Sequence, residues 1–183
     1  MQSEAKRLSG LVQEIIDLSR LQDDDPLKNG KVVDLSDSIS EAIDQSRLNA
    51  EKRKITLVFE GVADVKINGD RGQVIMAINN LIENAINYSP DSTRVAITLK
   101  VIDSIAEVAV SDQGIGIPEK DLPFIFDKFY RVSREDNKEI EGFGIGLSYV
   151  KKICQLHHWN VSISNTINGL QITIRIPKKD IYE

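Results

Sequence analysis

The sequence predicts an α+β fold, a two-layer sandwich of helices on a mixed, mostly antiparallel sheet, preceded by one amphipathic helix. Two patterns predict it. Several long segments carry apolar residues every three or four positions, which is the period of a helix with one buried face. Shorter runs between them alternate apolar and polar residues and end at turn-forming residues, as half-buried strands do.

Length and composition limit the size and the class of protein that this chain can be. With 183 residues and 41% hydrophobic content, the chain can form one domain with its own core and a short appendage. Acidic and basic residues are interspersed and the formal net charge is −5, so nothing indicates a nucleic-acid surface. No apolar run reaches the roughly 20 residues of a membrane helix, and no signal peptide is visible. We therefore expect a cytoplasmic piece that is not inserted in a membrane, whether or not its parent protein is anchored there.

The first part of the chain predicts a helix and a linker. Residues 1–21 repeat apolar side chains at spacings of three and four, a seam of about two heptads that is too short to fold without partner helices. The repeating residues are Leu8, Leu11, Ile15 and Leu18. Residues 22–30 are acidic, contain Pro26 and end at Gly30, which is typical of a linker. The main domain is therefore expected to occupy residues 31–183.

The beginning of the main domain predicts a strand, a helix and two further strands. In order, these are a strand at 32–33, a helix from Asp34 or Ser36 to about residue 54, and strands at 55–60 and 65–68. Ile39 and Leu48 lie broadly on one side of this helix. Residues 51–54 place mostly positive charge at its C-terminus, where the helix dipole favours cations.

The next helix carries an unusual row of amides. Asp70 and Gln73 have the spacing of a capping box, so the helix is expected to begin at this pair. Its buried stripe consists of Val74, Ile78, Leu81, Ile82 and Ala85. A different face, again at spacings of three and four, carries Asn80, Asn84, Asn87 and Tyr88. Because asparagine is a mediocre helix former, three on one face indicate a binding site; the alternative is a solvated polar face.

A hairpin is expected to deliver an acidic residue to a loop that contains glycine. The hairpin consists of strands at 94–101 and 105–111 joined through Asp103 and Ser104. Asp112 follows, and Gly114 and Gly116 then free the backbone to present N–H groups beside that carboxylate. Such a loop suits a ligand with a hydrogen-bonding base and an anionic tail, in short a nucleotide. The alternative is a plain turn in which Asp112 caps the strand.

The last part of the chain predicts a lid, a helix and two strands. The order is a charged, irregular segment at 130–143, a helix at 145–157, and strands at 160–166 and 170–176 joined around Asn168 and Gly169. We interpret the charged segment as a mobile lid. Cys154 falls in the apolar pattern of the helix and is expected in the core. His157 and His158 have no acidic neighbour, and we interpret them as a surface helix terminus.

Several segments in register resemble those of one known family. The N, G1 and G2 boxes of the sensor histidine kinase ATP-binding domain are similar to residues 80–90, 112–118 and 142–147. That domain belongs to the superfamily of gyrase, Hsp90, histidine kinases and MutL. Residues 124–131 look like its F box, and residues 18–20 resemble part of the second helix of the histidine kinase dimerisation domain. The resemblance implies the Bergerat ATP-binding fold for the main domain and a partial dimerisation domain before the linker.

The resemblance also implies a ligand, Mg-ATP. Asp112 would specify adenine, Asn84 would bind the metal through its amide oxygen, and Tyr88 is the candidate for stacking on the base. Asn87 stands where many family members have a lysine that reaches the phosphates. The expected cofactor-binding residues are Asn84, Asn87, Tyr88, Asp112, Gly114, Gly116, Ile117, Lys128, Gly142, Gly144, Gly146 and Leu147, with Asn84 as metal ligand. The expected catalytic residues are Asn80, which supports Asn84, and Arg131, which reaches the γ-phosphate.

Position 80 indicates the activity. In the ATP-hydrolysing branches of the superfamily, a glutamate at this position activates the attacking water, whereas Asn80 cannot act as a base. Glu83 is the nearest carboxylate on the helix, but it is rotated about 100° from Asn84. The resemblance thus implies a kinase that donates the γ-phosphate of ATP to a histidine on a dimerisation helix outside this chain. Its expected partners are the acceptor helix of the same homodimeric parent and a response regulator. The alternatives are a gyrase- or Hsp90-type ATPase and a nucleotide-dependent binding module without transfer.

Overall fold

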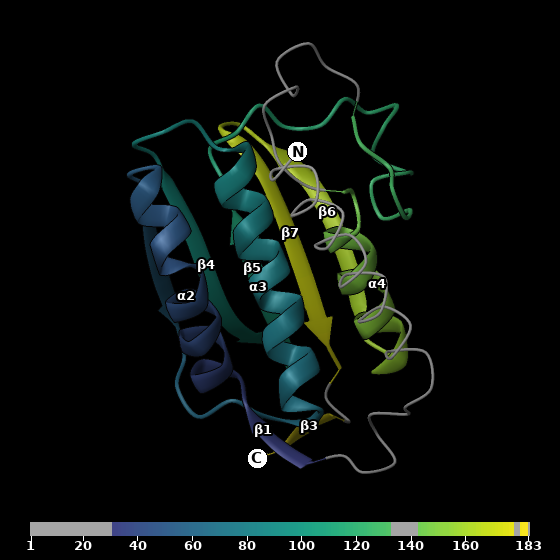
Figure 1. The fold of residues 1–183 in the computed structure, drawn as a ribbon. Helices are drawn as coiled ribbons and strands as arrows, with labels where there is room; N and C mark the ends of the chain where they lie inside the picture. The colour runs from purple at the N-terminus through teal and green to yellow at the C-terminus, as the bar shows by residue number, and fades with distance from the viewer. Residues whose placement is uncertain (1–30, 133–142, 178–179, 183) are drawn as a thin grey trace, which may run out of the picture.

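The computed structural model describes residues 31–132, 143–177 and 180–182. In this part, α2 (Leu35–Lys52), α3 (Arg71–Tyr88) and α4 (Gly146–Leu156) lie side by side on one face of a sheet (Figure 1). The strands of that sheet, in spatial order, are β2 (Thr56–Gly61), β4 (Arg94–Ile102), β5 (Ile105–Ser111), β7 (Gly169–Ile176) and β6 (Asn160–Thr166). The predicted α+β sandwich is therefore confirmed. The expected helix at 1–21, the linker at 22–30 and most of the expected lid lie outside the described residues.

A second, smaller sheet lies at one end of the sandwich (Figure 1). It pairs β1 (Lys31–Asp34), β3 (Lys66–Gly69) and β8 (Ile181–Tyr182) in antiparallel fashion. The sequence predicted β1 and β3 as strands but not β8, because two residues are too few to show an alternating pattern. The helix α3 begins one residue after β3, with Asp70 as its N-cap.

The hairpin before the expected nucleotide loop is confirmed. Asp103 and Ser104 both have positive φ, 50° and 63°, as the central residues of a type I′ turn do. The sheet is mixed because β2 and β4 run parallel, while its other neighbours are antiparallel. The hairpin returns β5 to the end of α3, so that a Cβ added at Gly114 would lie 2.5 Å from the Tyr88 carbonyl oxygen.

Aspartate side chains begin both long helices. Asp34 accepts the N–H of Asp37 at 3.1 Å, and Asp70 accepts that of Gln73 at 2.9 Å. The predicted capping box of α3 is only half formed, because Gln73 Oε1 is buried without a hydrogen-bond partner among the described residues. The backbone N–H of Asp70 donates instead to His157 Nε2 at 3.2 Å. The end of α4 therefore holds the start of α3.

The interpretation of His157 as a surface residue is wrong. Its ring is fully buried, lies 4.3 Å from the Trp159 ring between centroids, and places Nδ1 2.9 Å from the Ile153 carbonyl oxygen. A Cβ at Gly69 would lie 3.1 Å from the His157 ring, so β3 covers it. His158, by contrast, is exposed and has a positive φ of 57°. The helix does end at this pair, but packing against β3 buries its last turn.

The core lies between the helices and the sheet. Its largest fully buried side chains include Ile78, Leu81, Ile82 and Ile86 from α3 and Ile97 and Leu99 from β4. Cys154 is buried there as predicted, and burial raises the pKa of its thiol to about 12. Leu48 is 66% exposed, whereas Ile39, which the sequence placed on the same side of α2, is fully buried. The turn of α2 that carries Leu48 faces solvent at that position instead of α3 or the sheet.

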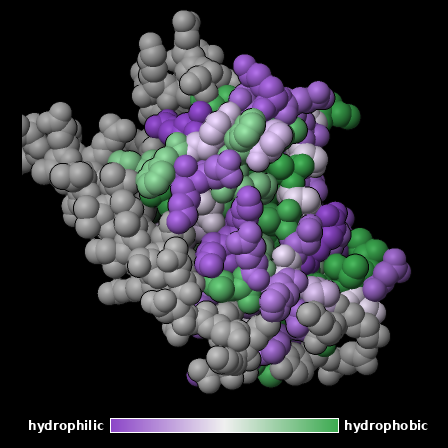
Figure 2. All heavy atoms as spheres, turned by 90° about the vertical axis from the view of Figure 1, so that its right-hand side faces the viewer, coloured by the Kyte–Doolittle hydropathy of each residue, from purple (hydrophilic) through white to green (hydrophobic). Residues whose placement is uncertain are grey.

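The surface around α4 mixes residue types. Figure 2 shows hydrophilic residues interspersed with smaller groups of hydrophobic ones on this side of the molecule. Within the described ranges, no helix combines the length and the apolar character that crossing a membrane would require.

Candidate functional site

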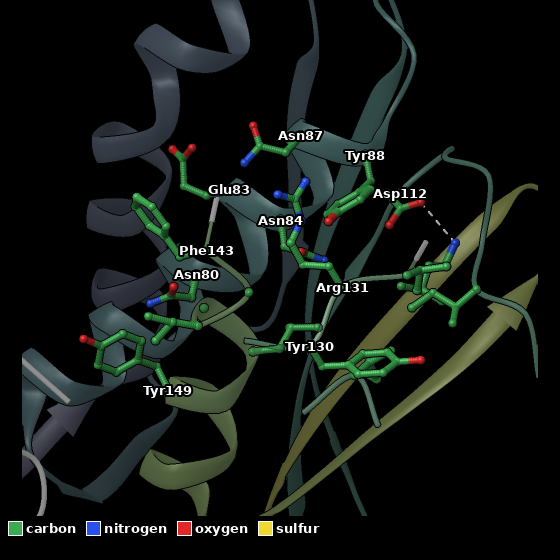
Figure 3. A pocket seen from close by; sticks show the side chains of 18 of the residues that line it. Asn80, Glu83, Asn84, Asn87, Tyr88, Asp112, Tyr130, Arg131, Phe143 and Tyr149 are labelled. Carbon is green, nitrogen blue, oxygen red and sulfur yellow. Dashed lines mark hydrogen bonds between the residues drawn. The ribbon is translucent and has the colours of Figure 1, made fainter. Parts of the chain in front are cut away.

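A cavity of about 550 Å³ opens where α3 ends, beside the loop that follows β5 and the segment that precedes α4 (Figure 3). Most of the expected site residues line it: Asn80, Asn84, Asn87, Tyr88, Asp112, Gly116, Ile117, Arg131, Gly144, Gly146 and Leu147. Gly114 and Lys128 do not line it, and Gly142 lies outside the described residues. The cavity brings together residues from segments that are far apart in the sequence.

The amide row of α3 forms one wall. Asn80, Asn84 and Asn87 project toward the cavity from successive turns, and Tyr88 follows at the end of the helix (Figure 3). Asn80 donates from Nδ2 to the Met76 carbonyl oxygen at 2.8 Å, which fixes its rotamer. A Cβ at Gly146 would lie 2.9 Å from Asn80 Oδ1, so the first turn of α4 packs directly against this side chain.

Asp112 lies beside Tyr88 at the end of this row (Figure 3). Its Oδ1 accepts the backbone N–H groups of Gly114 at 2.8 Å and Leu170 at 3.1 Å. Its Oδ2 has no hydrogen-bond partner among the described residues. Burial raises the pKa of the Asp112 carboxyl, and the two N–H groups oppose that shift because they stabilise the charged form. The side chain is thus fixed through one oxygen while the other remains for a ligand.

Gly114 and Gly169 explain how Asp112 is held. Gly114 supplies the N–H group that fixes the carboxylate, although it does not itself line the cavity. A Cβ at Gly169 would lie 2.7 Å from Asp112 Oδ1, closer than real side chains approach. Only glycine therefore allows β7 to begin this close to the carboxylate. The sequence predicted a turn at Gly169 but not its contact with Asp112.

Asn165 holds the loop after Asp112. Its Oδ1 accepts the N–H of Ile117 at 2.9 Å, and its Nδ2 donates to the Ile117 carbonyl oxygen at 2.7 Å. Gly116 has a φ of 63°, and a Cβ there would lie 2.8 Å from Asn165 Oδ1. Sequence reasoning missed Asn165, because it is 48 residues from Ile117 and nothing in its own strand indicates the contact.

The segment before α4 forms the third side. Gly144 has a φ of 72°, and its carbonyl oxygen accepts the N–H of Phe129 at 2.9 Å. Ile145, at the N-cap of α4, makes no side-chain capping hydrogen bond. The first turn of α4 therefore begins at the cavity without a capping side chain, which leaves helix N–H groups available to an anion.

The two candidate cations differ in position. Arg131 lines the cavity and its side chain is directed into it (Figure 3). Lys128 instead lines a separate hollow together with Lys151 and Lys152 of α4. The structure therefore brings one of the two predicted cations to the site and leaves the other on a neighbouring surface.

Several lining residues were not expected from the sequence. They are Met76, Glu83, Ile115, Ile125, Tyr130, Val132, Phe143, Ile145, Tyr149 and Leu170. Most are apolar or aromatic, and no pattern in the sequence separates them from core residues. Glu83 is the important one, since we expected the helix to turn it away from Asn84. It lines the cavity edge, and its Oε2 accepts from Asn49 Nδ2 at 3.0 Å.

The sequence of this chain is similar to a known family and to curated proteins. Residues 69–180 match the family described as histidine kinase-, DNA gyrase B-, and HSP90-like ATPase. Sensor-like histidine kinase SenX3 of Mycolicibacterium smegmatis is 34% identical over 97% of this chain and 47% of its own length. Sensor histidine kinase CusS of Escherichia coli strain K12 is 29% identical over 95% of this chain and 36% of its own length. The chain thus spans about half the length, or less, of these curated relatives.

Solved structures share the fold. The nucleotide-free catalytic domain of histidine kinase ThkA aligns with a TM-score of 0.72 and 26% identity, covering 81% of this chain and 95% of that chain. Histidine kinase ThkA in complex with response regulator protein TrrA aligns with a TM-score of 0.76 and 25% identity, covering 97% of this chain and 49% of that chain. The residues that line the cavity all lie within residues 69–180, the range of the family match.

Proposed function

Since this chain belongs to the family of histidine kinase-, DNA gyrase B- and HSP90-like ATPases, we propose that it is the ATP-binding catalytic region of a sensor histidine kinase. The family implies ATP binding. The proposed reaction moves the γ-phosphoryl group of ATP to a ring nitrogen of an acceptor histidine. The bond between the γ-phosphorus and the β–γ bridging oxygen breaks, a phosphorus–nitrogen bond forms, and ADP leaves.

The observation that carries the proposal is the pairing of a buried carboxylate with a row of amides across one cavity. Asp112 Oδ2 would accept the exocyclic amine of adenine, and Tyr88 would stack on the base. A charge-assisted hydrogen bond of this kind favours adenine over a base that presents a carbonyl there, because two acceptors would then face each other.

The other end of the cavity fits a magnesium-bound triphosphate. Magnesium prefers oxygen ligands and retains several from water or phosphate, so the Asn84 amide oxygen is a suitable protein ligand. When bound, the ion would neutralise part of the triphosphate charge. The uncapped start of α4 would hold phosphate oxygens by its N–H groups, and Arg131 would approach the γ-phosphate.

The chain's own part in the transfer is to position ATP and stabilise charge. Phosphoryl transfer needs little covalent help from the protein when donor and acceptor are aligned. Asn80 offers no base for water, which favours transfer to an external histidine over hydrolysis. The proposed partners are the acceptor helix of the same homodimeric parent and a response regulator, and the proposed location is the cytoplasm.

A second candidate function, ATP hydrolysis, is favoured by one observation. Glu83 lines the cavity, and a carboxylate there could activate water if it reached the γ-phosphate. Its Oε2 is already bonded to Asn49, which holds it at the rim. A third candidate is a binding module that takes up ATP without transferring phosphate.

One experiment separates the three candidates. The chain is incubated with γ-labelled ATP, first alone and then with the acceptor domain of its parent. We expect ATP binding, little phosphate release, and label on the acceptor histidine only when that domain is present. Rapid phosphate release that Glu83→Gln abolishes would establish the ATPase. Binding with neither release nor transfer to the acceptor domain would leave the binding module.

A further inference from the structure

Arg53 binds the end of α3, although it follows α2 in the sequence. Its Nη1 donates to the carbonyl oxygens of Ile86 at 2.7 Å and Asn87 at 2.9 Å. Its Nη2 donates to the Ser89 carbonyl oxygen at 2.9 Å. These carbonyls belong to the last turn of α3 and its C-cap, where no further helical N–H group is available to bond them.

Two further contacts fix the position of Arg53 itself. Its Nε donates to Asp91 Oδ1 at 2.9 Å, and its own carbonyl oxygen accepts the N–H of Ser92 at 3.1 Å. Lys54 then turns the chain with a positive φ of 54°, and Ile55 donates back to the Ala50 carbonyl oxygen at 2.8 Å. Arg53 is therefore held in place by contacts with Asp91 and Ser92, which follow the end of α3 in the sequence.

The turn that Arg53 binds carries the nucleotide site. Asn84, Asn87 and Tyr88 line the cavity from the last two turns of α3, and the Asn87 carbonyl is itself an Arg53 partner. A shift of this turn would move all three side chains together. Isolated helix ends fray, because their last carbonyls lack partners within the helix. Arg53 supplies those partners from outside the helix with a rigid, planar set of donors.

We propose that Arg53 is a positioning residue for nucleotide binding, because its guanidinium fixes the final turn of α3 and thereby the placement of Asn84, Asn87 and Tyr88. This inference rests on the proposed function, since it presumes that the cavity holds ATP. Arg53 touches none of the ligand-facing atoms named above and acts only through the backbone. It also places a positive charge at the negative end of the α3 helix dipole.

The test compares ADP affinity in variants of the full 183-residue chain. Arg53→Ala removes the whole contact, whereas Arg53→Lys retains the charge but cannot bond three carbonyls in the same fixed geometry. We expect both variants to bind ADP roughly tenfold more weakly, because a small displacement of ligand-contacting groups is costly. Titration calorimetry well below the melting temperature, where each variant is folded, separates this effect from a loss of stability.

Two controls match these variants. Arg47→Ala removes an exposed arginine of α2 that pairs only with Asp44 among the described residues, so ADP affinity should not change. Asp91→Ala removes the exposed ionic partner of Arg53 and leaves the carbonyl contacts, and affinity should stay within about twofold because such surface pairs contribute little.

Hydrogen exchange distinguishes a local positioning role of Arg53 from a general contribution to stability. In Arg53→Ala, the amides of residues 84–89 should exchange faster while those of β4 and β5 do not. Wild-type affinity in Arg53→Ala, or in Arg53→Lys, overturns the proposal, as does a uniform rise in exchange across α3 and the sheet. If the wild-type chain does not bind ADP at all, the proposed function fails first, and the positioning role fails with it.

Discussion

His157 Nε2 accepts the backbone N–H of Asp70 at 3.2 Å, so the last turn of α4 is bonded to the N-cap of α3. The same ring places Nδ1 2.9 Å from the Ile153 carbonyl oxygen. The neutral ring with its proton on Nδ1 satisfies both contacts. A second proton on Nε2 would face the Asp70 N–H and break the link between the helices.

This contact predicts a loss of stability in mild acid. Burial lowers the pKa of His157, against the opposing effects of the Ile153 carbonyl and the nearby Asp70 and Asp180 carboxylates; the neighbouring His158 lowers it slightly further. Because the folded state then binds its proton at lower pH than the unfolded state, this contribution to stability is complete above the ordinary value of 6.5. It decreases as the pH falls below that value toward the lowered pKa.

Urea denaturation across that pH range measures the effect. His157→Gln should lower the free energy of unfolding at neutral pH and flatten its dependence on pH just below 6.5. His158→Gln, which removes only the smallest of the effects on the His157 pKa, should keep most of the wild-type dependence. Equal pH profiles for the wild type and His157→Gln would contradict the assignment.

Asp112→Asn should weaken ADP binding and leave the fold intact. The loss of a charge-assisted hydrogen bond to the base corresponds to roughly 1.5–3 kcal/mol, or about tenfold to a hundredfold in affinity. Titration calorimetry measures it, with Asp103→Asn in the distant hairpin turn as the matched control. Unchanged ADP affinity in Asp112→Asn would remove this carboxylate from the site.

Asn84→Ala should weaken ATP binding mainly when magnesium is present. Only the contact through the metal is removed, and the base-binding end of the cavity stays as it is. Affinities measured with magnesium and with a chelator give the comparison, and Asn160→Ala on the exposed edge strand is the control. An equal loss under both conditions would show that Asn84 does not act through the metal.

Gly169→Ala should destabilise the fold and weaken nucleotide binding together. The added Cβ would lie 2.7 Å from Asp112 Oδ1, and relieving such a contact costs about 1–3 kcal/mol. Gly72→Ala, in the exposed first turn of α3, should change stability by less than about 1 kcal/mol and leave ADP binding unchanged, because the better helix propensity of alanine is opposed by a Cβ that would lie 3.3 Å from Asp70 Oδ1. Thermal melts and ADP titration test both, and a harmless Gly169→Ala would contradict the close approach of β7 to Asp112.

The sequence alone determined the local structure of the site. The amide row of α3 and the turn at Asp103 and Ser104 are where the patterns indicated, because side-chain period and turn geometry depend on residues a few positions apart. The Asp112 loop and the glycines before α4 likewise follow from local backbone requirements. The helix at 1–21 and the linker at 22–30 stay predictions, since they lie outside the described residues.

Only the tertiary structure decided which distant groups meet. Charge near Arg53 was predicted to serve the C-terminus of its own helix, yet Arg53 binds the carbonyls of α3. Asn165 likewise bonds to a loop 48 residues away, and β3 buries His157 at the end of α4. A side chain's type and period fix which face of its own element it occupies. Which partner it meets there depends on how the elements pack, because long-range contacts form only when the whole chain closes around one core.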